Sequence, residues 1–384
     1  MRKICAITAN RADWSRLESI LDALVKRPDV SFQLIVMGSH LLPEKGETLN
    51  EIRRKGFTPD RTIHMEVRGG TPVAMAQSAG LAIQKLSVAL DALSPDVVLV
   101  PVDRFESLSM GTAAALMNIH VAHIQGGEVT GTIDESVRHA LTKLSHLHFV
   151  ATKESRARVI KMGELKETVY MVGCPATDLL LRIPRWSRKT TLQKVNDLIP
   201  AGERKLDVEK PYLFMVQHPV TTEYGTAGRQ VAATLEALEE TGAQSIALWP
   251  NIDAGGESIS AVIKKRAHAS KNLSLFAHLP TELFGNVLRN TDCLIGNSSS
   301  GIREACYFGT PVVNVGSRQN KRERGTNVLD ALPEKSAIAE AIETQIRHGR
   351  YPIEPIYGDG TAGRKIAEIV ATVVLPPLQK QITY

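Results

Sequence analysis

Short apolar runs separated by amphipathic stretches of helical length recur along this chain of 384 residues, and no other feature constrains its fold as strongly. The runs Lys3–Thr8, Phe32–Met37 and Asp96–Pro101 have the length and apolar content of buried strands. Between the first two, Trp14–Val25 places apolar side chains at helical spacing. Strands separated by helices of this length predict βαβ units and a parallel sheet.

The pattern forms two series. In the first, we expect further strands at Val121–Ile124, His148–Thr152 and Val169–Val172, and helices at Ala74–Leu90, Ser107–Met117 and Ser136–Leu147. Residues 183–209 are rich in charge and predict a linker with a small surface element. The second series has strands at Tyr212–Val216, Ser245–Trp249, Leu273–Phe276, Cys293–Ile295 and Val312–Val315, and helices at Ala227–Thr241, Ile259–Ala269, Thr281–Arg289 and Ile302–Phe308. We therefore expect an α/β protein with two doubly wound Rossmann-like domains, residues 1–182 and 183–362, that face a ligand cleft.

Composition excludes several classes of protein. Hydrophobic residues make up 43% and charged residues 23%, as in soluble globular proteins. The net charge of +5 is too small and dispersed for nucleic acid, but suits an anionic small molecule. We expect no membrane span and no signal peptide, because Met1–Ile4 already begins a strand-like run, and hence a cytoplasmic location. The scattered cysteines predict neither a disulfide framework nor a zinc site: Cys5, Cys174, Cys293 and Cys306.

The loop Gly296–Gly301 is a candidate anion site. It joins an expected strand to an expected helix, so backbone N–H groups at the helix start can face an anion. Its glycines allow close approach, and its polar side chains add donors: Asn297, Ser298, Ser299 and Ser300. A plain helix cap without a ligand is the alternative, because Ser and Asn are preferred capping residues. Glu304, in the expected first helical turn, is a candidate for ribose hydroxyls or for a favourable position near the helix dipole.

Arginine side chains follow the first strand. Arg11 lies at the mouth of the expected cleft, where it can pair with a phosphate or form a surface ion pair. Ser15 and Arg16 occupy the next turn, and Asp13 is expected to be the helix N-cap.

Acidic and polar side chains follow two further strands of the first series. Asp103 and Arg104 come after the strand that ends at Pro101, and Gln125 and Glu128 come after Ile124. Asp134 follows a short distance later. Carboxylates at one cleft edge suit general acid/base chemistry, although local ion pairing or helix capping would also account for them.

The second series carries polar residues in equivalent places. His218, Asn251 and His278 lie in loops that follow three of its strands, and Arg318 follows the strand at Val312–Val315. Each is a candidate for binding phosphate or sugar. Each residue alone is weak evidence for a binding site, but together they place several polar loops on one edge of the expected sheet.

These motifs resemble those of the hydrolysing UDP-N-acetylglucosamine 2-epimerases, nearly from end to end. The resemblance rests on Asn10–Asp13, Gly38–His40, Asp103–Phe105, Gly126–Glu128, Gly131–Asp134, Gln217–Pro219, Pro250–Asp253, Gly296–Ser299, Gly309–Pro311 and Ile356–Gly360. It implies a glycosyltransferase-B-like fold whose last helix, in residues 363–384, completes the first domain. It also implies elimination of UDP to a glycal and hydration to N-acetylmannosamine, with no metal or other cofactor.

By this resemblance, acid/base roles fall on Asp103 and Asp134. The nucleotide would be held by Arg11, His218, Ser298, Ser299 and Arg318, with Glu304 on the ribose. The resemblance further implies a homo-oligomer, a dimer or tetramer.

Two residues depart from the family pattern. Val102 precedes Asp103 where the family often has Gly, and Gln125 stands where a catalytic Glu is expected. Since Gln cannot ionise, Glu128 is the candidate to compensate. The alternative substrate is a UDP- or GDP-linked 2,4-diacetamido-2,4,6-trideoxyglucose of the legionaminic-acid type. A non-catalytic nucleotide-sugar binding protein, a glycosyltransferase and a non-hydrolysing epimerase are the other hypotheses.

Overall fold

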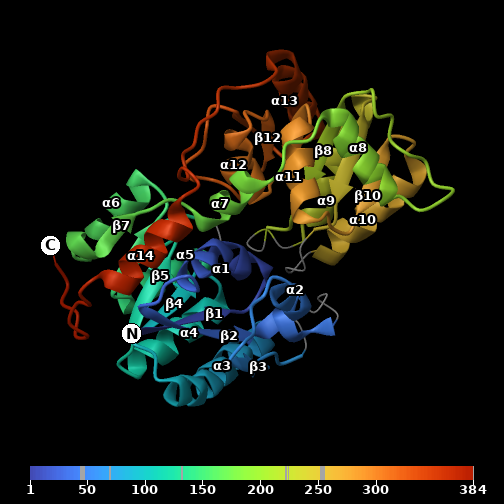
Figure 1. Ribbon diagram of the computed structural model, residues 1–384. Coiled ribbons are helices and arrows are strands. Elements are labelled where there is room, and N and C mark those ends of the chain that lie inside the picture. Colours follow the sequence, from blue (N-terminus) through green and yellow to red (C-terminus); the bar gives the residue numbers. More distant parts are fainter. Residues whose placement is uncertain are drawn as a thin grey trace. The chain divides into compact units, whose positions relative to one another are not determined.

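The computed structural model describes residues 1–43, 48–68, 71–130, 133–220, 223, 225–250 and 256–383. Its internal contacts divide the chain into two compact units. Unit 1 comprises Met1–Val129, Ile133–Leu181 and Tyr357–Tyr384, and unit 2 is essentially Arg182–Ile356. Figure 1 shows the red C-terminal segment lying with the blue N-terminal elements of unit 1.

Unit 1 contains a seven-stranded parallel sheet with the strand order β3-β2-β1-β4-β5-β6-β7. The strands are β1 Arg2–Thr8, β2 Val30–Met37, β3 Arg61–Ile63, β4 Val97–Pro101, β5 His120–Ile124, β6 Leu147–Val150 and β7 Val169–Met171. The helices are α1 Arg11–Leu24, α2 Leu49–Arg54, α3 Pro72–Leu93, α4 Phe105–Leu116, α5 Asp134–Leu144, α6 Lys153–Lys161, α7 Pro175–Arg182 and α14 Ala362–Thr372. The order reverses between β1 and β4, and such a switch point is where doubly wound sheets bind ligands.

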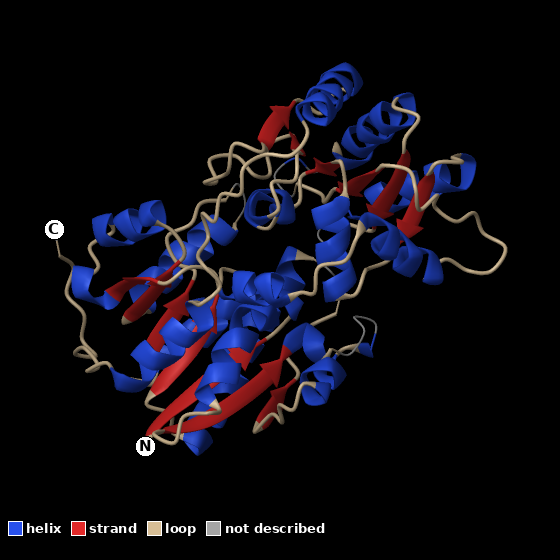
Figure 2. Cartoon of the chain, turned by 45° about the horizontal axis from the view of Figure 1, so that its top comes forward, coloured by secondary structure: helices blue, strands red, loops and turns tan. Residues whose placement is uncertain are grey.

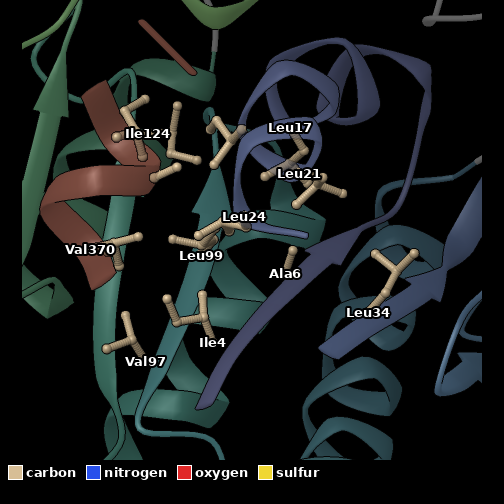
Figure 3. Packing of buried hydrophobic residues seen from close by; sticks show 14 of the residues in the cluster. Ile4, Ala6, Leu17, Leu21, Leu24, Leu34, Val97, Leu99, Ile124 and Val370 are labelled. Carbon is tan, nitrogen blue, oxygen red and sulfur yellow. The ribbon is translucent and has the colours of Figure 1, made fainter. Parts of the chain in front are cut away.

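Alternate residues of β1 fill two different cores. Ile4 and Ala6 pack with α1 and α14 on one face, and Figure 3 shows them beside Leu17, Leu21 and Val370. Cys5 and Ile7 pack on the other face with residues of α3 and α4. A strand covered on both faces needs a continuous apolar run, which is what β1 has.

The C-terminal helix α14 completes unit 1. The Asp178 carboxylate accepts hydrogen bonds from the backbone N–H groups of Ala362 and Gly363, at 3.1 and 2.6 Å. Those two groups lack partners within the helix, so Asp178 satisfies the start of α14. Ile366 and Val370 then join the core beside α1.

Unit 2 contains a six-stranded parallel sheet with the order β10-β9-β8-β11-β12-β13. The strands are β8 Tyr212–Val216, β9 Gln244–Leu248, β10 Leu273–Phe276, β11 Cys293–Gly296, β12 Val312–Val315 and β13 Val328–Ala331. The helices are α8 Arg188–Asp197, α9 Ala227–Glu240, α10 Gly256–Ala269, α11 Thr281–Asn290, α12 Ser299–Arg303 and α13 Lys335–His348. Helices lie along both faces of this sheet (Figure 2), and the switch point falls between β8 and β11.

Several sequence expectations need correction. Residues 183–209 are not a surface linker, because α8 buries Leu192 and Val195 in the core of unit 2. Helix α8 has few apolar residues among its charged and polar ones, so the sequence shows no clear helical spacing of apolar residues there. The helix expected over Ile302–Phe308 is instead α12 followed by a 3₁₀ turn at Ala305–Tyr307. All four cysteines are free and buried, as expected of small core residues.

Helix α3 is long and apolar enough, by length and composition alone, to cross a membrane. In the structure, its Ala82, Leu86 and Leu90 pack into the core of unit 1. One face of α3 therefore packs against the sheet, while 33% of its most apolar window is buried.

Two glycine substitutions test the packing of α14. A Cβ on Gly363 would lie 2.6 Å from the Ser19 carbonyl oxygen, whereas a Cβ on Gly80 in α3 would meet nothing within 4 Å. We expect Gly363→Ala to destabilise unit 1 by about 1–3 kcal/mol through overpacking. Gly80→Ala should stabilise it by about 0.5–1 kcal/mol through helix propensity. Urea unfolding measures both, and an equal response would contradict the close contact between α14 and α1.

Candidate active site

The predicted loops of unit 1 meet at the carboxyl ends of its central strands. Arg11, Asp103 and Gln125 follow β1, β4 and β5, which are neighbours in the sheet. Arg11 is the first residue of α1 and its side chain is exposed. Arg104 directly precedes α4, and its Nε lies 3.3 Å from the Glu106 carboxylate.

Asp13 is a buried carboxyl group and not the helix cap. Asn10 caps α1 by accepting the Asp13 N–H at 3.1 Å. The Asp13 carboxylate turns back and accepts from Ala9 N at 3.0 Å and from Asn10 Nδ2 at 3.1 Å. Burial and then the Glu106 charge raise the pKa of Asp13 to about 7. The Asp13 carboxyl group, which holds the backbone just before Arg11, therefore titrates near neutral pH.

Arg138 organises the acidic residues. Its side chain is fully buried and pairs with the carboxylates of Asp103 and Glu135, the second at 2.9 Å. A further N–H donates to the Glu128 carbonyl at 2.8 Å. Burial disfavours its charge, yet Asp103, Glu128 and Glu135 raise the pKa of Arg138 above its ordinary value. The guanidinium thus fixes Asp103, whose side chain remains 20% exposed.

Glu128 and Asp134 both lie between Asp103 and Arg138 in the chain. Glu128 is buried, and the preceding Gly127 carbonyl accepts a hydrogen bond from Arg158 of α6. Asp134 is half-buried and is the first residue of α5. The cap position is Ile133, whose side chain makes no capping bond, and Thr132 before it lies outside the described residues.

Val102 has a strained backbone immediately before Asp103. Its φ is 51°, in the left-handed region that a β-branched residue rarely adopts. Two hydrogen bonds hold it: its N–H donates to Ile124 at 3.0 Å, and its carbonyl accepts from His123 Nε2 at 2.7 Å. Burial lowers the pKa of His123 to about 4, so its ring is neutral at pH 7. This conformation explains why glycine suits the position in related sequences.

Gln125 contacts the second turn of α1. Its Oε1 accepts the Arg16 Nε–H at 3.2 Å, and Arg16 Nη1 also reaches Ser15 Oγ at 2.5 Å. The Ser15 hydroxyl donates to the Ala12 carbonyl at 2.8 Å. Ser15 is therefore tied to the loop and to Arg16.

In unit 2, a two-way hydrogen bond joins the loops after β8 and β11. His218 N–H donates to Asn297 Oδ1 at 2.7 Å, and Asn297 Nδ2 donates to the His218 carbonyl at 2.8 Å. Gly296 has φ of 128°, and a Cβ there would collide with the Val216 carbonyl. Burial and then Arg318 lower the pKa of His218 to about 3, so this ring is neutral at physiological pH.

The serine residues open helix α12. Ser298 is its N-cap and accepts from Ser300 N at 3.3 Å and Ser300 Oγ at 2.8 Å. Ser299 is the first helical residue and is half-buried. Arg318 Nη1 donates to the Asn297 carbonyl at 3.2 Å, which ties Arg318 to the same loop.

The remaining expected site residues of unit 2 are Glu304, His278 and Asn251. Glu304 is not in the first turn, because α12 is only five residues long and Glu304 follows its last residue. The dipole explanation for Glu304 is therefore wrong. His278 is exposed in the loop after β10. Asn251 lies outside the described residues.

Sequence reasoning missed Arg138, Arg16 and Glu106 as parts of the arrangement in unit 1. Arg138 follows Asp134 at a helical interval, which was a usable signal, but nothing local shows that it is buried. Within the part of the chain that the structure describes, no group of three or more His, Cys, Asp and Glu residues could hold a metal ion.

Two doubly wound parallel sheets, each with polar loops gathered at its switch point, define the glycosyltransferase-B-like fold class. The model of one family in this class, UDP-N-acetylglucosamine 2-epimerase, matches residues 22–371, and the chain belongs to that family. It is therefore an enzyme of the epimerase class.

Three comparisons place the chain within this family. It is 35% identical to the UDP-N,N'-diacetylbacillosamine 2-epimerase (hydrolyzing) of Legionella pneumophila, over 100% of this chain and 98% of that one. It is 32% identical to a UDP-N-acetylglucosamine 2-epimerase of Neisseria meningitidis, over 96% and 95%. A crystal structure of UDP-GlcNAc 2-epimerase from Neisseria meningitidis bound to UDP-GlcNAc shares the fold, with TM-score 0.81, 17% identity, and coverage of 96% and 99%.

A matched pair of valines tests the strain before Asp103. Val102→Gly loses a buried side chain but relieves left-handed strain of about 1–3 kcal/mol, so we expect a net change below about 1 kcal/mol. Val98→Gly removes a fully buried side chain from regular strand β4 and should cost about 2–4 kcal/mol. Thermal unfolding measures both variants. Equal losses would contradict a strained Val102.

Proposed function

We propose that the protein is a hydrolysing 2-epimerase that converts a UDP-linked 2-acetamido sugar and water into UDP and the free 2-epimer. The observation that carries this is the Asp103 carboxylate, which is held at the switch point of unit 1 by a buried guanidinium. A partly exposed carboxylate in a fixed position can exchange a proton with a bound sugar. Relatives named as hydrolysing span the chain and support the same reaction.

The sugar we propose is a 2,4-diacetamido-2,4,6-trideoxy sugar, N,N'-diacetylbacillosamine. It is named in the Legionella relative at 35% identity and in a Campylobacter jejuni relative, the GDP/UDP-N,N'-diacetylbacillosamine 2-epimerase, at 33%. The first expectation from sequence, UDP-N-acetylglucosamine, is named in a relative at 32% and remains the second candidate. Both sugars carry the C2 acetamido group and the C2 hydrogen that the reaction needs.

The reaction divides into two balanced steps. A base removes the C2 proton while the C1–oxygen bond breaks, so that the electron pair leaves with UDP and a glycal forms. Water then adds its hydroxyl to C1, and C2 receives a proton on the opposite face. We assign Asp103 and Asp134 to these proton transfers, with Glu128 as a further candidate. Both steps are proton transfers that side chains of this kind perform.

In unit 2, the loop Gly296–Ser300 is the proposed diphosphate site. The His218–Asn297 hydrogen bonds hold its start, and Arg318 adds a positive charge beside it. Ser298, Ser299 and Ser300 supply hydroxyl or backbone donors at the start of α12. By resemblance, Arg11 also pairs with phosphate and Glu304 binds the ribose.

Asp103→Asn tests the proposed proton transfer. The amide keeps the shape of the carboxylate but cannot act as a base, so UDP release should fall by about 10³-fold or more. UDP binding, measured by titration calorimetry, should change little. Retention of more than about a tenth of the activity would remove Asp103 from the mechanism.

Asp96→Asn is the matched control, because Asp96 lies at the opposite end of β4. Its carboxylate accepts the Lys3 N–H at 2.8 Å. This variant should retain the activity, and circular dichroism should show that both variants fold.

Turnover in deuterated water tests the reaction itself. The protein is incubated without an acceptor with UDP-N,N'-diacetylbacillosamine, UDP-N-acetylglucosamine and the GDP-linked diacetamido sugar in parallel. We expect free UDP and a 2-epimer deuterated at C2, fastest with the first substrate. A UDP-linked epimer as product, or the absence of turnover with all three, would contradict the proposal.

A further inference from the structure

Gln125 has an unusual backbone and is almost completely buried. Its φ is 68°, in the left-handed region, and its N–H donates to the Phe149 carbonyl of β6 at 2.7 Å. Its relative exposure is 2%. A non-glycine residue keeps such a backbone only where its surroundings hold it, and such residues gather at functional sites.

Arg16 fixes which way the Gln125 amide points. Arginine has donors and no acceptor, so the atom that faces Arg16 Nε at 3.2 Å must be the amide oxygen. Arg16 is itself held from the other side, where Nη1 donates to Ser15 Oγ at 2.5 Å and to the Ala12 carbonyl at 3.3 Å. The amide NH₂ group of Gln125 is therefore directed away from Arg16.

That NH₂ group is buried and has no hydrogen-bond partner among the residues that the structure describes. A buried donor without a partner is unfavourable, and native proteins rarely leave one unsatisfied. An acceptor supplied by a ligand would satisfy it. Gln125 lies at the carboxyl end of β5, beside the strand that carries Asp103, which is where a ligand of this sheet is expected.

We propose that Gln125 donates a hydrogen bond from Nε2 to an acceptor oxygen of the bound sugar, and that Arg16 is its positioning residue. This inference rests on the proposed function and goes beyond it, because it gives Gln125 a binding role and no proton transfer. Since Nε2 is a donor only, this position selects an acceptor oxygen, such as an acetamido carbonyl, and not an N–H group.

Gln125→Glu removes the donor. The new carboxylate can still accept from Arg16, so the contact that positions the side chain is kept, while the NH₂ group is lost and a negative charge is added. We expect affinity for the nucleotide sugar to fall roughly tenfold and affinity for UDP alone to stay unchanged. Titration calorimetry in an Asp103→Asn background measures both without turnover. Unchanged affinity for the sugar nucleotide, or an equal loss for UDP, would overturn the proposal.

Steady-state kinetics with Asp103 intact gives a second readout. Gln125→Glu should raise KM about tenfold while kcat changes by less than about threefold. A rise in kcat would mean that the carboxylate takes part in proton transfer, and would overturn the proposed role. Gln33→Glu is the matched control, because Gln33 Nε2 donates to the Leu93 carbonyl at 2.9 Å, outside the proposed site. Its KM should stay unchanged.

The role of Arg16 is tested by rescue. Arg16→Met frees the amide to rotate and should raise KM, whereas Arg16→Lys can still donate to Gln125 Oε1 and should restore most of the affinity. In a Gln125→Met background, Arg16→Met should have no further effect, because the two residues act as a unit. Additive losses would show that Arg16 acts separately.

The two proposals fail in different ways. If no nucleotide sugar releases UDP, the epimerase reaction is wrong, yet the difference between UDP and sugar-nucleotide binding can still be measured. If wild type turns over and Gln125→Glu behaves identically, only the role of Gln125 is wrong.

Discussion

A guanidinium buried away from water is the constraint on which the polar side of unit 1 depends. The Arg138 side chain is fully buried, and an uncompensated charge in such a place costs several kcal/mol. Its partners must therefore be in position whenever the unit is folded. They come from three places in the chain: Asp103 after β4, the Glu128 carbonyl in the loop after β5, and Glu135 in α5. One buried charge thus fixes loops that the sheet alone would leave adjustable.

Of the five non-glycine residues with positive φ in the described part of the chain, two lie at the same edge. Val102 and Gln125 both have left-handed φ values and both directly follow central strands. Neighbouring strands hold each of them, since Val102 N–H donates to Ile124 and Gln125 N–H donates to Phe149. Such conformations cost about 1–3 kcal/mol and persist only where the surroundings over-determine them. The regular sheet supplies that support, so the strain sets where Asp103 and the Gln125 amide point.

The strands of the two sheets could be predicted from the sequence because both sheets are buried on both faces. The continuous apolar run Tyr212–Val216 coincides with strand β8 in the structure, and Val312–Val315, which Asn314 interrupts, coincides with β12. The positions of the polar loops followed, since parallel strands bring their carboxyl ends to one edge. The bounds of some helices could not be predicted from the sequence. Charged residues obscure the apolar pattern of α8, and α12 ends before Glu304.

Side-chain roles in unit 1 depended on long-range contacts that no local pattern reports. Asp13 fits a helix cap by position, but Asn10 takes that place and leaves Asp13 buried. Arg138 looks like one of many helical arginines until its partner Asp103, 35 residues away, is seen. Burial decides both roles, and burial is a property of the folded chain.

The polar loops of the two units differ in the charge of the side chains that join them. In unit 1, Asp103 lies in a cluster of paired charges, in which Arg138 contacts Asp103 and Arg104 contacts Glu106. In unit 2, the loops at the switch point are joined by the neutral amide of Asn297 and by a His218 ring that burial keeps uncharged. A site for a diphosphate needs donors and net positive potential more than it needs internal ion pairs. Arg318, whose Nη1 donates to the Asn297 carbonyl at 3.2 Å, places a positive charge beside this loop, and for this reason we assign the nucleotide to unit 2 and the proton chemistry to unit 1.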